Sequence, residues 1–96
     1  MKVEYTKRAT ADLRKVSADS WPYGETVTAA VEARIRRVID QISRFPEHGS
    51  KIEERPSVRV IPLIHFPYKI FYRILDDRVR ILHIRHTSRR PWTQER

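Results

Sequence analysis

The chain has 96 residues, no cysteine and only two glycines, and 40% of its residues are hydrophobic. This length allows one domain over residues 1–96 and leaves no room for a second core. The lack of cysteine excludes disulfides, thiol catalysis and thiolate metal sites, and it suits a reducing compartment. No apolar run resembles a membrane span, and the N-terminus lacks a signal-peptide pattern, so we expect a cytoplasmic protein with no membrane partner.

The charge is strongly positive and unevenly placed. Twenty Lys and Arg oppose twelve Asp and Glu, which gives a formal net charge of +8. Such a field attracts nucleic acid, the ribosome or an acidic protein. After Arg78 only Glu95 opposes a run of arginines, namely Arg80, Arg85, Arg89, Arg90 and Arg96. A surface that serves only solubility mixes the signs more evenly, so we interpret residues 87–96 as a basic tail that binds an anion.

The N-terminal part predicts a short strand followed by a helix. Residues 2–6 (KVEYT) alternate between polar and apolar side chains, which is typical of a strand. Thr6 can cap a helix over residues 7–18, whose apolar stripe is Ala9, Leu13 and Val16. Residues 20–25 (SWPYGE) contain a proline and a glycine and predict a turn.

The second helix has the clearest pattern in the sequence. Apolar residues recur there every three or four positions, at Val27, Val31, Ile35, Val38, Ile42 and Phe45. Pro46 and Gly49 end the pattern. Because the turn before this helix is short, the two helices should form an antiparallel hairpin.

From Val58 onward the hydrophobic period changes to two. Three runs, residues 58–66, 68–75 and 78–86, read as strands. Asp76 and Asp77 predict a tight connection between the last two, and Pro62 predicts that the first lies at an edge or carries a bulge. The order is β-α-α-β-β-β. We therefore expect an α+β fold, with the helical hairpin packed on one face of a mostly antiparallel four-stranded sheet.

A helical hairpin covers only one face of such a sheet, so the composition of the other face matters. Alternation places Phe71 and Leu75 with Lys69 and Arg73 on one face, and it pairs Leu82 with Ile84 on the face opposite Val79 and Ile81. The uncovered face is therefore partly apolar and partly basic. Either a curved sheet closes it with its own loops, or a partner segment with apolar anchors and acidic flanks lies on it.

His86 is the candidate for chemistry, because it ends the last strand beside Arg85. A histidine can act as general acid or base, and nearby cations can hold phosphate, as metal-free RNA cleavage requires. A surface histidine near a basic tail is the alternative. Arg59, Lys69 and Arg73 lie on adjacent predicted strands and can share a face with this end of the sheet.

Other residues predict no further chemistry. His83 should share a face with Val79 and Ile81, which predicts a packed structural histidine. No histidines or carboxylates have the spacing of metal ligands, and the glycine content allows no phosphate loop, so we expect neither a metal nor a cofactor.

Three segments resemble the ParE/RelE superfamily of type II toxin–antitoxin (plasmid stabilisation) toxins, and its ParE branch in particular. They are RFPEHG at residues 44–49, FPYKIFYRI at 66–74 and DDRVRILHIRH at 76–86. The resemblance implies a cytoplasmic toxin that a cognate antitoxin inactivates by wrapping its C-terminal segment over the helices and the sheet. Opposite charge predicts that this segment is acidic. The apolar residues assigned to this contact are Phe71, Leu75, Leu82 and Ile84.

The superfamily divides by target, and the resemblance implies alternatives. RelE-like members cut mRNA on the ribosome, and ParE-like members poison DNA gyrase. Where the ribosome-dependent enzymes have an arginine in a Tyr-Arg-Leu-Val-Tyr strand, this chain has Lys69, and it has no tyrosine after Tyr72. A nuclease would have to use His86 as acid–base catalyst, with Lys69 and Arg85 on the phosphate.

We therefore favour a growth-inhibiting toxin of the gyrase type. Its target- or anion-binding residues would be Arg59, Arg73, Arg85, Arg89 and Arg90. The alternative is an mRNA endonuclease in which Arg89 also contacts phosphate. A degenerate member that binds only its antitoxin is the third possibility.

Overall fold

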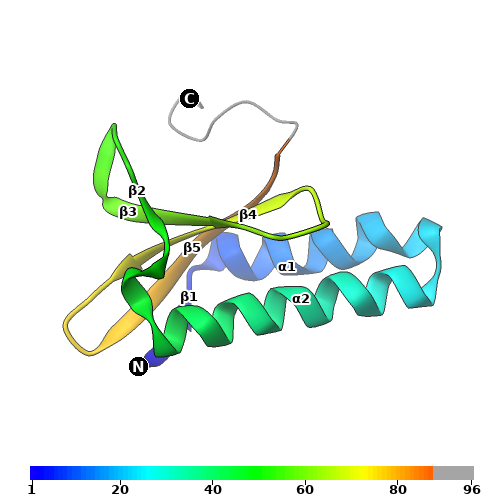
Figure 1. The fold of residues 1–96 in the computed structure, drawn as a ribbon. Coiled ribbons are helices and arrows are strands. Elements are labelled where there is room, and N and C mark those ends of the chain that lie inside the picture. The colour runs from blue at the N-terminus through cyan, green and yellow to red at the C-terminus, as the bar shows by residue number, and fades with distance from the viewer. Residues whose placement is uncertain (88–96) are drawn as a thin grey trace.

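The computed structural model describes residues 1–87, which form a curved sheet above a helical hairpin (Figure 1). Strand β1, Lys2–Tyr5, passes directly into helix α1, Lys7–Ser20. Thr6 caps this helix as predicted, because its Oγ1 accepts a hydrogen bond from the Ala9 N–H at 3.0 Å. The same hydroxyl donates to the Leu82 carbonyl at 2.9 Å, so the cap also attaches the helix to the sheet.

The predicted turn between the helices is a short 3₁₀ segment, Trp21–Tyr23, followed by Gly24. Gly24 has a φ of 102°, in the region that favours glycine, and it precedes helix α2, Glu25–Arg44. The two helices form the expected antiparallel hairpin (Figure 1). The middle of the predicted apolar stripe of α2 is buried, whereas Val27 and Phe45 at its ends are exposed.

Within residues 1–87 the sheet has five strands in the order β1-β5-β4-β3-β2. After a 3₁₀ turn at Pro46–His48 the remaining strands are β2, Ser50–Ile52; β3, Arg55–Pro62; β4, Tyr68–Ile74; and β5, Arg78–His86. The pairing of β1 with β5 is parallel, and the other pairings are antiparallel. The predicted α+β class and the mostly antiparallel sheet are confirmed. Strand β2 was not predicted.

Pro62 predicts that its strand, β3, lies at an edge or carries a bulge, and the position of β2 corrects the first alternative. The second is met, because the β2–β3 register shifts between Lys51 and Ile52, although Pro62 lies outside that irregularity. Strand β3 lies inside the sheet along most of its length, because β2 pairs with it from Arg55 to Val60. Pro62 is the last residue of β3 and lies beyond that pairing, so its missing N–H removes no hydrogen bond to β2. The β2–β3 hairpin rises from the sheet on the side away from the helices (Figure 1).

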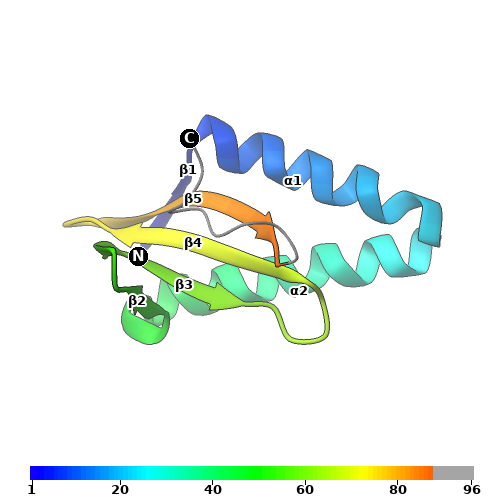
Figure 2. The same cartoon turned by 90° about the horizontal axis from the view of Figure 1, so that it is seen from above.

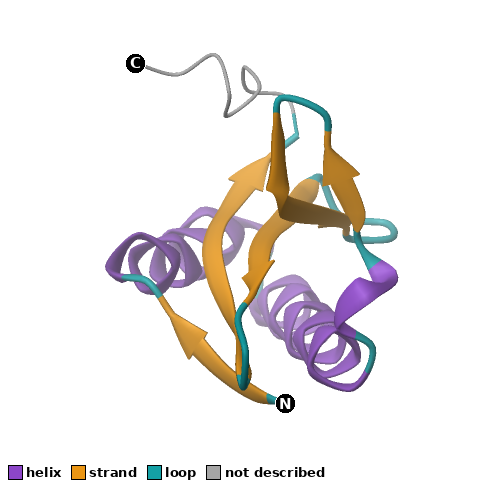
Figure 3. Cartoon of the chain, turned by 90° about the vertical axis from the view of Figure 1, so that its left-hand side faces the viewer, coloured by secondary structure: helices purple, strands orange, loops and turns teal. Residues whose placement is uncertain are grey.

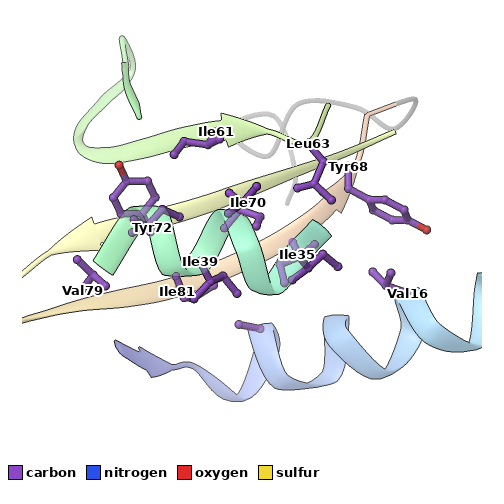
Figure 4. Close-up of a cluster of buried hydrophobic side chains, with 14 of the residues drawn as sticks. Val16, Ile35, Ile39, Ile61, Leu63, Tyr68, Ile70, Tyr72, Val79 and Ile81 are labelled. Atoms are coloured by element: carbon purple, nitrogen blue, oxygen red, sulfur yellow. The ribbon is translucent and has the colours of Figure 1, made fainter. Parts of the chain in front are cut away.

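Both helices lie on the same side of the sheet, as Figures 1 and 3 show. Seen from above, α1 runs along the β5 side and α2 along the β3 side (Figure 2). The core fills the space between the layers (Figure 4). Its largest fully buried side chains, at less than 2% exposure, are Tyr72, Ile42, Ile70, Ile81, Val31 and Val79.

A β-bulge changes which face of β5 each residue occupies. Tyr72 pairs with Ile81, and the preceding Phe71 pairs with His83, so Leu82 is an extra residue in β5. Ile84 therefore points into the core beside Ile70. The prediction that Ile84 shares the uncovered face with Leu82 is wrong, and so is the prediction that His83 shares a face with Val79 and Ile81. Strict alternation does not hold through a bulge.

Candidate functional site

The sheet face that points away from α1 and α2 is called the second face here, and its residues on β4 and β5 form cross-strand pairs. Lys69 pairs with Arg85, Phe71 with His83, and Arg73 with Arg80. Two cation pairs thus flank one pair of rings. The expectation that Lys69, Arg73 and Arg85 share a face is met by this register.

The middle of the second face is tightly packed. The rings of Phe71 and His83 stack with centroids 5.8 Å apart and planes 20° apart. The guanidinium carbon of Arg85 lies 5.7 Å from the centroid of Phe71, within the range of a cation–π contact. Phe71 and Arg85 are only 4% and 5% exposed. Leu75 and Leu82 are half-buried.

His83 is buried as predicted, but its polar partners come from α1. Its Nδ1 lies 2.6 Å from Asp12 Oδ2, and Arg8 Nη2 lies 3.4 Å from its Nε2. Because a guanidinium only donates hydrogen bonds, these partners place the proton on Nδ1 and the acceptor on Nε2. The same Asp12 oxygen accepts the Ile84 N–H at 2.9 Å. Asp12 thus holds both the imidazole and the exposed edge of β5.

Sequence reasoning missed Asp12, although a signal was present. Asp12 lies three residues after Ala9 and four before Val16, so it shares the apolar face of α1. A carboxylate on a buried helical face requires a polar partner. Alternation alone could not identify His83 as that partner, because the bulge moves it.

Two arginines contact a glutamate at the β1 end of the second face, and a third arginine lies opposite one of them. Arg80 pairs across the strands with both Arg73 and Glu4. Arg80 Nε donates to Glu4 Oε2, and Arg78 Nη1 donates to Glu4 Oε1 at 2.8 Å. The hydrogen bond from Arg80 is the main cause that lowers the pKa of Glu4, and Arg78 adds to it. Glu4 is therefore an anion at neutral pH.

His86 lies on the opposite face from Lys69 and Arg85. It pairs with Tyr68, and the two rings meet edge to face with centroids 5.3 Å apart. Tyr68 belongs to the core cluster on the helix side, as Figure 4 shows. Both residues line a cleft of about 450 Å³ between the tip of the helical hairpin and the β3–β4 loop, with Tyr23, Val27 and Phe66 on its walls.

Arg59 is also separated from the cations of the second face. It pairs with Tyr72, whose side chain lies in the core. Its Nη1 donates to the carbonyls of Glu47 at 3.1 Å and Gly49 at 2.8 Å. The expectation that Arg59 shares a face with Lys69 is wrong. Arg59 pairs with Tyr72, which faces the core, whereas Lys69 pairs with Arg85 on the second face. Arg89 and Arg90 lie outside the described residues.

This arrangement defines what the second face can do. It offers cations for an anionic group at two places, but its histidine is packed between Phe71 and Asp12. Within residues 1–87 no three His, Asp or Glu side chains are grouped so that they could hold a metal ion. Neither helix in that range has the length and apolar character needed to cross a bilayer.

Comparison of the sequence with models of known protein families identifies its family. The family described as "ParE toxin of type II toxin-antitoxin system, parDE" matches residues 3–91. The chain belongs to this ParE toxin family. Among curated protein sequences, none matches significantly.

Solved structures share the ParE-family fold. A chain of the chromosomal ParDE system from P. aeruginosa has a TM-score of 0.78 at 22% identity, over 90% of this chain and 95% of that one. A chain of the intact RelBE toxin–antitoxin complex from E. coli has a TM-score of 0.69 at 18% identity, over 93% of this chain and 98% of that one. The YoeB/ParE toxin from Agrobacterium tumefaciens has a TM-score of 0.68 at 16% identity, over 90% of this chain and 98% of that one. At these identities the likeness shows the fold alone.

Proposed function

We propose that this ParE-family chain inhibits growth by binding a large cytoplasmic target of the DNA gyrase type, and that it does so without cutting RNA. The observation that carries this proposal is the placement of Lys69 and His86 on opposite faces of the sheet. Lys69 lies on the second face, and His86 pairs with Tyr68 on the other. Arg85 and His86 both line a small pocket at the β5 edge, but the Arg85 side chain is almost fully buried. Acid–base catalysis needs the histidine within hydrogen-bond reach of the reacting oxygen while the cations hold the same phosphate.

We further propose that a cognate antitoxin holds the toxin inactive by placing an acidic C-terminal segment on the second face. Two structures of similar fold are described as a ParDE system and an intact RelBE toxin–antitoxin complex, which supports a partner of this kind. The chemistry of the face also supports it, since its cations lie beside the half-buried apolar side chains of Leu75 and Leu82, whereas Phe71 is buried. Ile84 is not part of this contact, because it lies in the core.

An mRNA endonuclease is the second candidate, and one observation favours it. Lys69 lies directly opposite Arg85, so the positive charge of the buried Arg85 adds to that of Lys69 where a phosphate could bind. In this candidate His86 would have to reach past the end of β5 to the same phosphate. Loss of His86 would then reduce the rate of RNA cleavage by about 10²–10⁴.

The test expresses the toxin without antitoxin in a bacterial host and follows growth. The gyrase-type proposal predicts that His86→Ala arrests growth as the unchanged toxin does. Reversal of charge at Arg89 and Arg90 to Glu should abolish the arrest, because an anionic surface on the target would then be repelled. The matched control reverses Arg36 and Arg37, which are exposed on α2, and should leave the arrest intact.

Purified protein separates the remaining outcomes. Supercoiling by gyrase should be inhibited by the unchanged toxin and by His86→Ala, and not by the Arg89/Arg90 reversal. Growth arrest that depends on His86 would instead support the endonuclease. If expression leaves growth unchanged and gyrase active, the chain is a family member that binds only its antitoxin, and the proposal is wrong.

A further inference from the structure

The cation pair at the β1 end of the second face is incompletely balanced. Arg73 on β4 lies directly opposite Arg80 on β5, an arrangement that destabilises a strand pair. Glu4 compensates Arg80 and Arg78, and Asp77 accepts a hydrogen bond from Arg78 Nε at 3.1 Å. Within residues 1–87 no carboxylate forms an ion pair with Arg73.

Arg73 also has a buried donor without an acceptor. Its Nε is inaccessible to solvent and makes no hydrogen bond within the described part of the chain. Buried donors on charged groups are nearly always satisfied, because an unmade hydrogen bond there is costly. Neither water nor a described acceptor therefore offsets the charge of this guanidinium at its Nε, and a second guanidinium lies opposite it.

The local charges select the chemistry of a group that could offset this charge. Within residues 1–87 the ion pairs of Glu4 and Asp77 go to Arg78 and Arg80 and leave Arg73 without a carboxylate. A single carboxylate from a partner would supply that ion pair. A nucleic-acid strand would bring several phosphates close to Glu4 and to the exposed Asp76 and Asp77, where like charges repel.

We infer that Arg73 and Arg80 form a docking site for a carboxylate side chain of a protein partner. Arg73 is half-buried, and the terminal nitrogens of its guanidinium would donate to the carboxylate oxygens in a charge-assisted hydrogen bond. The inference rests on the proposed function only for the identity of the partner, the antitoxin. The site itself rests on the geometry of β1, β4 and β5.

The second cation pair extends the prediction to two acidic residues. Lys69 lies four residues before Arg73 on β4, which corresponds to about 13 Å along a strand. An extended partner segment spans this distance between residues four apart. The partner should therefore carry acidic side chains at positions i and i+4, with the intervening side chain at i+2 facing the sheet.

The test is an NMR titration of the ¹⁵N-labelled protein with acetyl-Glu-Ser-Leu-Ser-Glu-amide. The matched probe replaces both glutamates with glutamine, and a five-nucleotide oligothymidylate supplies phosphates. We expect the Arg73 Nε–H resonance to shift with the Glu peptide and not with the Gln peptide. Arg73→Gln should weaken the binding of the Glu peptide about five- to tenfold. Arg37→Gln, an exposed control on α2, should leave it unchanged.

Two results would overturn the inference. If Arg73→Gln weakens binding of the oligothymidylate as much as binding of the Glu peptide, the site recognises phosphate. If it affects neither probe, Arg73 is not a docking residue. The titration uses neither growth nor gyrase nor antitoxin, so its failure is distinct from failure of the proposed function.

Stability without any ligand provides the second measurement. A docking site that keeps like charges together is less stable than its neutralised variant, because the repulsion is relieved only on binding. Arg73→Gln should therefore raise the melting temperature by about 1–4 °C. A lower melting temperature would mean that Arg73 stabilises the fold, and the inference would be wrong.

Discussion

At the scale of single residues, Tyr72 shows how one side chain fixes the connection between the layers. Its hydroxyl donates to the Pro46 carbonyl at 2.5 Å and accepts the Gly49 N–H at 2.9 Å. A Cβ at position 49 would lie 2.6 Å from that hydroxyl oxygen, so only glycine fits there. Tyr72 is fully buried, and it joins the end of α2 to the middle of β4.

Tyr72→Phe should lower the free energy of unfolding by about 1–3 kcal/mol, because it leaves two backbone groups without their partner. Urea denaturation measures this loss. Tyr23→Phe is the control, since Tyr23 is 76% exposed, and it should change stability by less than about 0.5 kcal/mol. Equal effects of the two substitutions would show that the Tyr72 hydrogen bonds do not stabilise the fold.

The pH dependence of the same variant follows from the sign of the pKa shift. Burial raises the pKa of Tyr72, while the hydrogen bond from Gly49 and the charge of Arg59 oppose this. Because the pKa of Tyr72 is higher in the folded state, the free energy of unfolding is at its full value below the pKa of an unfolded tyrosine, about 10. It then falls as the pH rises above that value. Above about pH 10 the wild type should therefore lose stability more steeply than Tyr72→Phe.

At the scale of secondary-structure elements, the sequence predicts the helices better than the sheet. Helix α2 is long, and its apolar residues recur at helical spacing, so the residues that it buries can be predicted from the sequence. Strand β2 has three residues and no alternating pattern that could identify it. The bulge at Leu82 also has no local signal, and it alone moves Ile84 into the core and His83 onto the second face. Arg59 changes face because register cannot be read from one strand.

Helix α1 protects the part of β5 that β1 does not reach. Strand β1 pairs with β5 only as far as Ile81. Beyond it, the Thr6 hydroxyl binds the Leu82 carbonyl and the Asp12 carboxylate binds the Ile84 N–H. These side chains replace the missing strand and satisfy an edge that could otherwise pair with another chain.

Asp12→Ala should lower the free energy of unfolding by about 2–4 kcal/mol, because the Ile84 N–H and His83 Nδ1 both lose a charged acceptor in a buried place. Amide exchange at Ile84 should accelerate more than exchange at Ile70, in the middle of β4. Asp40→Ala is the control, since its ion pair with Arg44 is exposed, and it should cost less than about 1 kcal/mol. A loss no larger than the control's would contradict the role of Asp12 at the edge.

At the scale of the whole molecule, charge and fold jointly define the proposed function. The net charge of +8 indicates an anionic partner, but composition could not show where the cations converge. The structure collects Lys69, Arg73, Arg80 and Arg85 on the face that the helices leave uncovered. It also places His86 on the opposite face from Lys69, which depends on strand register and could not be predicted from the sequence. The family resemblance, in contrast, was readable from short segments and is confirmed over residues 3–91.

The most direct test of a toxin that does not cut RNA is a genome-wide map of RNA 5′ ends, minutes after the toxin is induced without antitoxin. For the unchanged toxin and for His86→Ala alike, we expect arrested growth with a map that matches the uninduced culture. New 5′ ends inside translated frames, present with the unchanged toxin and absent with His86→Ala, would contradict it. They would make the chain an mRNA endonuclease.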